Sequence, residues 1–225
     1  MIREVLFDLG GILYDDSAWR RWLLQLLGRM GLHTHYVSFY RVWDCEFQPE
    51  VWSGRSGFWP ALKRFLVATG LTCGQAAEIE AGCRARFRNF EQDIRPFPSV
   101  AETLKYVRAA GRSVAITSQA PLSSEQIKAQ LGKLQLLQYV NEVRGPCLEI
   151  STAGAFRRLA RQDGYAAGEA AYVGRDPVRL VAAHQADWLT VAFNSDPDVH
   201  ADFCIEQFDE LVGILDMAQP LRAAG

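Results

Sequence analysis

The sequence contains no apolar run of the roughly 18–20 residues that a membrane-spanning helix requires. It also has little net charge, because 24 Lys and Arg residues nearly balance 26 Asp and Glu residues and leave −2. This balance gives no electrostatic reason to expect binding to nucleic acid or to an anionic membrane. With 49% hydrophobic residues, the composition is that of a folded chain rather than a disordered one.

Cysteine is scarce and scattered. The five cysteines are odd in number and never form a Cys-x-x-Cys pair; they are Cys45, Cys73, Cys83, Cys147 and Cys204. We therefore expect neither a disulfide framework nor a zinc site. The first residues run straight into a strand-like segment, so we expect no signal peptide and a cytoplasmic location.

The first apolar segment, residues 5–7, is short and runs into Asp8-Leu9-Gly10-Gly11. A short apolar run bounded by glycines is typical of a buried parallel strand that enters a loop. Helical periodicity then dominates for about eighty residues, with many aromatic side chains on the apolar stripes. The aromatic residues favour the core of a helical bundle over a ligand-binding cage.

After residue 96 the pattern alternates between strands and helices. Strands are predicted at residues 113–116, 139–143, 170–173, 189–193 and 203–205, with helical segments between them. Such alternation predicts right-handed crossovers and a doubly wound parallel sheet, an α/β fold. The sequence thus predicts an α/β core of residues 1–14 and 96–225, interrupted by a helical domain of residues 15–95.

Three predicted strands end in polar residues: Asp8, Ser118 and the segment Gly174-Arg175-Asp176. In open parallel sheets the active crevice lies beyond the carboxyl ends of the strands. A carboxylate held there can act as a nucleophile toward phosphorus. The alternative is a turn aspartate that accepts hydrogen bonds from nearby amides, and the residues by themselves do not decide between the two.

Three segments, "VLFDLGGILYDD", "GRSVAITSQAP" and "AAYVGRDP", resemble successive signature segments of the haloacid dehalogenase superfamily. Each is a loose motif, but their order and spacing together are specific, and the resemblance spans nearly the whole chain. It implies a Rossmann-like α/β core with a helical cap inserted after the first strand. The cap is then the helical domain predicted above.

The resemblance implies that Asp8 is the nucleophile that forms an aspartyl-phosphate. It places Ser118 where a hydroxyl holds the phosphoryl group, and Gln119 where an asparagine is common. Gly10 and Gly11, in the loop after Asp8, are expected to contact the substrate together with Gln119. Aromatic residues of the cap are expected to line the substrate end of the site: Trp43, Trp52, Phe58 and Trp59.

Several positions depart from the family pattern. Gly10 stands where phosphatases carry an aspartate for general acid–base catalysis, which contributes about 10²–10⁴-fold. The family's lysine is expected near Glu149 to Ser151, where no basic residue occurs, and no lysine follows Lys133. Both losses argue for weak or absent metal-dependent turnover.

The acids that hold magnesium in the family are also replaced. Arg175 follows Gly174, and Leu180 stands at the expected second position. The remaining oxygen donors implied by the resemblance are Asp8, the carbonyl of Gly10, and Asp176, so Mg²⁺ is a doubtful cofactor. Asp176 lies directly before Pro177, which favours the cap of a helix.

Arg175 places a base where a metal ion is expected, and a guanidinium can pair with a carboxylate or bind an anion. In one hypothesis it forms an ion pair with Asp8 and the site is inactive. In the other it replaces the charge of the metal or lysine, and phosphoryl transfer runs weakly without metal.

Three functions remain open. The first is a haloacid dehalogenase-like phosphatase for a small phosphorylated metabolite, with Asp8, Ser118 and Arg175 as catalytic residues. The second is a catalytically degenerate member that binds a ligand or a protein. The third is a metal-free 2-haloacid dehalogenase in which Asp8 attacks carbon; it ranks last because those relatives also rely on the missing lysine.

Overall fold

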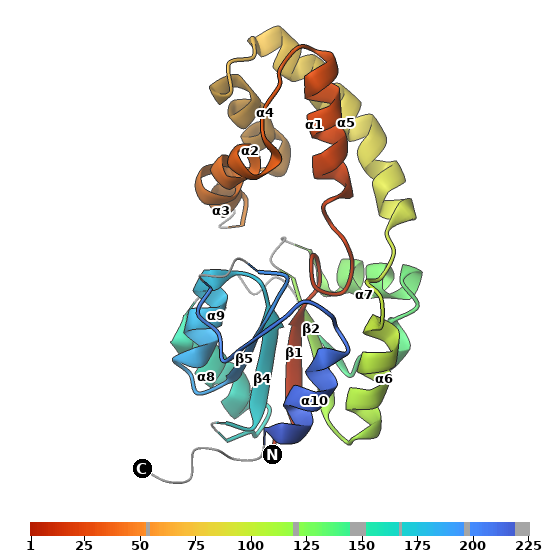
Figure 1. Cartoon of the computed structure of the whole chain (residues 1–225), viewed down its shortest axis with the longest axis vertical. Helices are drawn as coiled ribbons and strands as arrows, with labels where there is room; N and C mark the ends of the chain where they lie inside the picture. The colour runs from red at the N-terminus through yellow and green to blue at the C-terminus, as the bar shows by residue number, and fades with distance from the viewer. Residues whose placement is uncertain (53–54, 119–121, 145–151, 167, 196–198, 219–225) are drawn as a thin grey trace. The chain divides into compact units, whose positions relative to one another are not determined.

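The structure is a computed structural model that describes residues 1–52, 55–118, 122–144, 152–166, 168–195 and 199–218. The chain folds into two compact units (Figure 1). One unit combines Met1–Asp15 with Arg95–Gly225 and is built around a β-sheet. The other, Asp16–Ile94, is helical. The helical unit is thus inserted after the first strand of the α/β unit.

The sheet of the α/β unit has six strands in the order β3-β2-β1-β4-β5-β6. Their bounds are β1 Glu4–Asp8, β2 Ser113–Thr117, β3 Glu142–Val143, β4 Ala170–Gly174, β5 Leu189–Phe193 and β6 Phe203–Ile205. Every neighbouring pair is parallel. The predicted doubly wound parallel sheet is therefore confirmed. One strand was predicted too long, because a 3₁₀ turn, Leu137–Tyr139, occupies part of the segment assigned to β3.

Helices cover both faces of this sheet (Figure 1). They are α6 Val100–Ala109, α7 Ser124–Lys133, α8 Ala153–Gln162, α9 Pro177–His184 and α10 Glu210–Met217. Every residue of β1 and β4 is buried, as expected for central strands of a sheet covered on both sides. Leu6 and Tyr172 share one core cluster with Phe156 of α8 and Leu180 of α9. The helices α8 and α9 therefore pack on the face of the sheet that carries these two strand residues.

The helical unit has its own core. It consists of α1 Ala18–Arg29, α2 Tyr36–Val42, a π-helical turn Trp43–Phe47, α3 Gln48–Trp52, α4 Phe58–Ala68 and α5 Cys73–Asp93. Apolar side chains at helical spacing, such as Leu23, Leu27, Leu62 and Phe65, are fully buried. In the described parts of the chain, no helix is both long and apolar enough to cross a membrane.

A buried arginine ties α1 to the π-helical turn. Arg20 donates two hydrogen bonds to the Asp44 carboxylate, at 2.9 and 2.8 Å, and its carbonyl accepts one from the Tyr40 hydroxyl at 2.5 Å. Its guanidinium also lies over the Tyr40 ring, 5.0 Å from the centroid. A paired charge of this kind fixes the relative positions of the two elements because breaking it leaves a buried ion.

A second buried charge cluster lies in the α/β unit, around Arg144. Its Nη2 contacts Glu4 at 3.0 Å and Glu142 at 3.1 Å, and it also pairs with Asp163. Glu4 is only 1% exposed. Burial raises the pKa of Glu4 to about 7, and the positive charge of Arg144 only partly opposes this rise.

We expect the stability of the fold to decrease as the pH rises through 7. The pKa of Glu4 is about 7 in the folded chain and near its ordinary value of 4.5 when unfolded. The folded state therefore holds the proton more tightly, so the stabilisation is fully present below pH 4.5 and is lost toward pH 7 and above. Relative to Glu4→Gln, the wild-type free energy of unfolding should fall by about 1–3 kcal/mol between pH 5 and pH 8. Urea unfolding of both proteins across this range measures the difference, and two parallel curves would contradict the assignment.

Candidate active site

Asp8 is the last residue of β1 and lies at the carboxyl edge of the sheet. Its side chain is buried, with 2% of the residue exposed. Oδ2 accepts a hydrogen bond from the Tyr172 hydroxyl at 2.6 Å, and Oδ1 accepts one from Nη1 of Arg179 at 2.9 Å. Both oxygens of the carboxylate therefore have a protein donor, one neutral and one cationic.

Tyr172 reaches Asp8 because its ring lies along its own strand. It belongs to β4, beside β1, and pairs in register with Leu6 rather than with Asp8. A Cβ added at Gly174 would lie 2.5 Å from the Tyr172 hydroxyl oxygen, so the ring passes directly over the glycine. Burial, followed by the negative charge of Asp8, raises the pKa of Tyr172 well above its usual value. The phenol therefore stays protonated and remains a hydrogen-bond donor.

Arg179 comes from the first turn of α9 and points inward, toward Asp8. Burial by itself lowers the pKa of this guanidinium, but the negative charge of Asp8, together with Tyr172 and Asp176, outweighs burial and raises the pKa above its usual value. With only 6% of its side chain exposed, Arg179 is a fixed cation 2.9 Å from Asp8. A charge buried this deeply needs a partner of opposite sign, and the Asp8 carboxylate is that partner.

The second arginine of this region, Arg175, lies against the loop that follows Asp8. A Cβ at Gly11 would be 2.6 Å from the central guanidinium carbon of Arg175. Gly11 also has φ +72°, a left-handed conformation that favours glycine. The close approach and the backbone conformation therefore both require glycine at this position. Arg179 pairs with Asp8, while the pairing of Arg175 with Asp8 and its catalytic role stay predictions.

Sequence reasoning missed Arg179. The second acid position of the family was assigned to Leu180, but this side chain is fully buried in the core between helix and sheet. The residue just before it faces Asp8. The available signal was in α9, where Arg179 shares the buried face with Leu180 and Ala183. An arginine on the buried face of a helix needs a partner of opposite charge, because arginine is almost never fully buried unless it is paired.

The other predicted site residues are placed as follows. Ser118 directly follows β2 and is buried, next to Thr117, which pairs in register with Asp8. Gly10 lies in the loop after β1 and forms a bridge with Tyr14. Gln119 lies outside the described residues, as does the segment 149–151 in which the family's lysine was expected. The substrate and phosphate contacts assigned to these positions stay predictions.

Among the described residues, the carboxylates that the resemblance assigns to magnesium are already engaged with protein groups. The Asp8 carboxylate already forms an ion pair with Arg179, and Asp176 caps α9 by accepting a hydrogen bond from the Val178 amide at 2.9 Å. The capping role of Asp176 was the favoured interpretation and is confirmed. Within the described residues, no group of three or more His, Cys, Asp or Glu side chains could hold a metal ion. Mg²⁺ is commonly held by one or two protein carboxylates together with water and substrate phosphate, and here both candidate carboxylates already have protein partners.

The aromatic residues assigned to the substrate end need one correction. Trp43 is 1% exposed and packs on Phe58 at 5.6 Å and Phe65 at 5.4 Å, within the core of the helical unit. Its position is explained by packing, not by substrate binding. Trp59 is partly buried, with the Arg84 guanidinium 4.5 Å from its ring centroid. Trp52 ends α3, and its side chain lies outside the described structure.

Comparison with solved structures identifies the fold of the chain. No family model matches the sequence, and no curated protein matches it. A haloacid dehalogenase family hydrolase from Deinococcus radiodurans R1, solved with bound phosphate and sodium, superimposes with a TM-score of 0.71 at 17% identity, covering 96% of each chain. A dehalogenase solved as an intermediate complex gives 0.69 at 18% identity, covering 95% of this chain and 96% of that one.

The 2-haloacid dehalogenase from Pseudomonas syringae pv. Tomato DC3000 is also similar, with a TM-score of 0.54 at 21% identity, covering 96% of this chain and 99% of that chain. The chain therefore has the haloacid dehalogenase fold. The structural neighbours include dehalogenases and phosphate-binding hydrolases, and identities this low establish the fold and not the reaction.

We expect strong coupling between Asp8 and Arg179 in a double-mutant cycle. Arg179→Met removes the cation and leaves a buried carboxylate, which should cost about 3–5 kcal/mol of unfolding free energy. The double variant with Asp8→Asn should recover much of this loss, because the amide carries no charge. Urea unfolding of the two single variants and the double variant measures the coupling. Additive effects would show that the two groups do not interact as described.

Gly174→Ala should disturb the same site through the Tyr172 contact with Asp8 instead of the Arg179 contact. The new Cβ would displace the Tyr172 ring from Asp8, and overpacking of this kind costs about 1–3 kcal/mol. Gly213→Ala is the matched control, since no atom lies within 4 Å of a Cβ there and the residue is in α10. The control should gain about 0.5–1 kcal/mol from helix propensity. Thermal unfolding gives the midpoint temperature of each variant relative to the wild type, and equal changes for Gly174→Ala and Gly213→Ala would refute the role of Gly174.

Proposed function

We propose that the protein is a haloacid dehalogenase-type hydrolase for a small phosphorylated molecule, in which Arg179 replaces the charge of the metal ion at Asp8. The observation that carries this proposal is the 2.9 Å ion pair between the two side chains. The structural likeness to a hydrolase solved with bound phosphate supports the substrate class. In this proposal the helical unit is the cap domain of the fold.

The proposed reaction uses Asp8 as the nucleophile. One carboxylate oxygen forms a bond to phosphorus while the bond between phosphorus and the leaving oxygen breaks, and the leaving group takes the electron pair. Water then attacks phosphorus, releasing phosphate and restoring Asp8. The Ser118 hydroxyl is proposed to donate to the phosphoryl oxygens, and the cation of Arg179 offsets the added negative charge.

Two features make this reaction slow and selective. The ion pair stabilises the carboxylate before reaction, so part of that stabilisation is lost as Asp8 attacks. Gly10 cannot donate a proton to the departing oxygen, a contribution of about 10²–10⁴-fold. We infer that the preferred substrates have leaving groups that are stable as anions, such as the carboxylate of an acyl phosphate or the phenolate of an aryl phosphate.

Phosphate release should therefore depend on the leaving group and not on magnesium. We expect turnover of acetyl phosphate and p-nitrophenyl phosphate, little with an alkyl phosphate, and the same rates in Mg²⁺ and in EDTA. Asp8→Asn should abolish the activity because the amide oxygen is a poor nucleophile. Phosphate release by both proteins, with each substrate in each buffer, is the measurement.

Two results would contradict this proposal. Turnover that requires Mg²⁺ would show that a metal site persists in spite of Arg179. Equal rates for the wild type and Asp8→Asn under every condition would favour a binding protein without catalysis. Ser38→Ala, an exposed serine in α2, serves as the control for unspecific effects of substitution.

Metal-free dehalogenation is the second candidate. The observation in its favour is that Asp8 is neutralised by an arginine while the carboxylates assigned to magnesium are already engaged with protein groups. Here Asp8 attacks the carbon that bears the halogen, halide leaves with the bonding electrons, and water hydrolyses the resulting ester. Halide release from 2-chloropropionate by wild type, but not by Asp8→Asn, separates this candidate from the phosphatase.

A further inference from the structure

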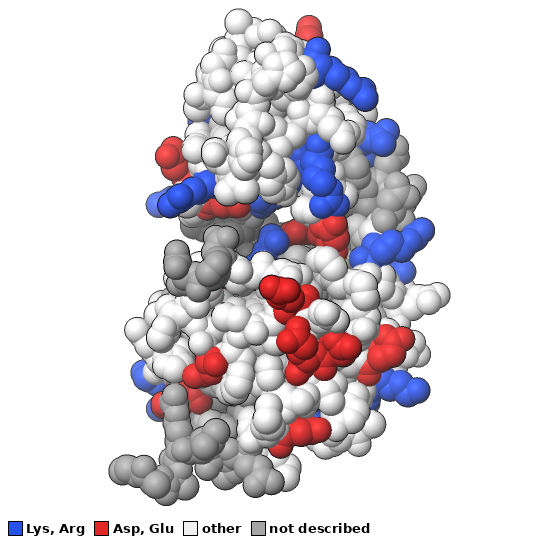
Figure 2. Space-filling model, viewed as in Figure 1, with Lys and Arg blue, Asp and Glu red and all other residues white. Residues whose placement is uncertain are grey.

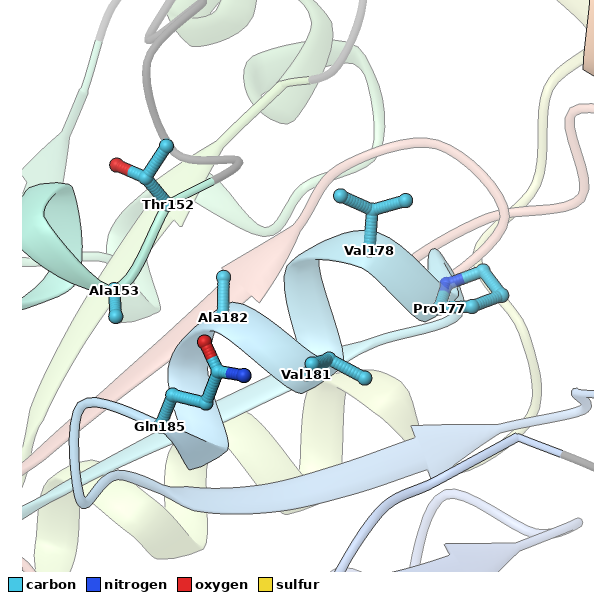
Figure 3. Close-up of a pocket in the computed structure, with 7 residues that line it drawn as sticks. All are labelled: Thr152, Ala153, Pro177, Val178, Val181, Ala182 and Gln185. Carbon is cyan, nitrogen blue, oxygen red and sulfur yellow. The ribbon is translucent and has the colours of Figure 1, made fainter.

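A surface cavity of about 520 Å³ lies between α8 and α9 (Figure 3). It is lined by Thr152, Ala153, Pro177, Val178, Val181, Ala182 and Gln185. In Figure 3, Val178, Val181 and Gln185 all project from α9, and Ala153 lies opposite them at the start of α8. The lining is therefore mainly aliphatic, with an amide at one end and a hydroxyl at the other.

The two faces of α9 differ in an unusual way. Its inward face carries Arg179, which holds Asp8, together with core residues. Its outward face carries Val178 and Val181, which are 59% and 36% exposed. These positions are three residues apart and form one stripe along the helix. Helices that contact water normally have polar residues on such a face, so exposed aliphatic residues beside a cavity indicate a binding surface.

Basic side chains lie along α8, and one of them, Arg157, reaches the cavity lining. Helix α8 exposes Arg157, Arg158 and Arg161. The acids that flank the two helices, Asp163 and Asp176, are engaged with Arg144 and with the Val178 amide. Arg157 spans the two helices, because its Nη2 donates to the carbonyl of Gln185 at 2.5 Å. The net charge of the whole chain is −2, and Figure 2 shows acidic side chains gathered on the α/β unit. The charge of α8 is therefore locally opposite to that of the chain.

We propose that this surface, the α8–α9 groove, binds an acidic amphipathic segment of a partner protein. An aliphatic side chain of the segment enters the cavity between Ala153 and Val181, and its carboxylates pair with Arg157 and Arg161. Charge complementarity selects an acidic partner, and the aliphatic lining selects an amphipathic one. The proposal is independent of any reaction at Asp8.

The openness of the groove favours a protein over a small molecule. Small-ligand pockets enclose most of the ligand surface. Here Val178 is 59% exposed at the mouth of the cavity, so a small ligand would stay largely in water. A partner chain would cover the exposed valines with its own side chains and exclude water from the contacts.

The test uses fluorescently labelled helical peptides and the full-length protein. One peptide has leucines on a single helical stripe and glutamates elsewhere, and the matched peptide has lysines in place of the glutamates. Fluorescence anisotropy should show the acidic peptide binding at least about tenfold more tightly than the basic one. The preference should weaken as salt is added, because the charged contacts lie at the surface.

Three variants locate the binding. Val178→Glu with Val181→Glu should weaken binding of the acidic peptide by about tenfold or more, since it puts like charges in the groove. Arg157→Glu with Arg161→Glu should reverse the preference toward the basic peptide. Arg41→Glu, an exposed residue of the helical unit, is the charge control and should leave binding unchanged. Circular dichroism checks that each variant is folded.

The proposal fails if both peptides bind equally or if the groove variants bind like the wild type. Binding to phosphatidylserine vesicles without peptide binding would assign the surface to an anionic membrane instead. A dimer in sedimentation experiments that Val178→Glu with Val181→Glu dissociates would assign it to a second copy of this chain. Each of these outcomes overturns the proposed partner.

Discussion

The ion pair between Asp8 and Arg179 joins two residues that are 171 positions apart in the chain. A carboxylate as deeply buried as Asp8 is unstable unless a cation or strong donors compensate it. Arg179 supplies the cation and Tyr172 the second donor, so β1, β4 and α9 meet at one point. Gly174 follows from it, because it makes room for the tyrosine ring, and Gly11 nearby makes room for Arg175. The packing of β1, β4 and α9 at this point therefore serves to neutralise one buried charge.

An arginine and a metal ion can neutralise the same carboxylate, but they do so with different consequences. A metal ion can exchange, and it can bind the phosphoryl group and the nucleophile together. A guanidinium is covalently fixed to α9 and adds to the stability of the folded chain even without a ligand. In the proposed function, the site therefore has a permanent structural contact in the place where catalysis would use a replaceable one. Exchanging catalytic groups for stabilising ones is a recognised route by which activity decreases while the fold remains.

The parts of the site that could be predicted are those that depend on local sequence. Asp8 at the end of a strand, and the cap formed by Asp176 before Pro177, both follow from a few neighbouring residues. Alternating strands and helices likewise determine the parallel sheet, because the handedness of each crossover restricts the topology. For these features, short-range patterns contain most of the necessary information.

The features that were missed depend on contacts between distant segments. Periodicity placed Arg179 on a helix but did not show that Asp8 would lie opposite it, and Leu180 was considered in its place. Trp43 was assigned to the substrate, whereas it fills the core of the helical unit. The short strand β3 was overextended, because a two-residue strand has too few residues for an alternating pattern.

The most direct test of the account is a calorimetric titration of Mg²⁺ into the wild-type protein, Asp8→Asn and Arg179→Met. If Arg179 occupies the place of the metal charge, the wild type will show no Asp8-dependent binding at millimolar Mg²⁺. Any binding that Arg179→Met gains should then disappear when Asp8→Asn is added to it. One-to-one binding of Mg²⁺ by the wild type, lost in Asp8→Asn, would contradict the central claim.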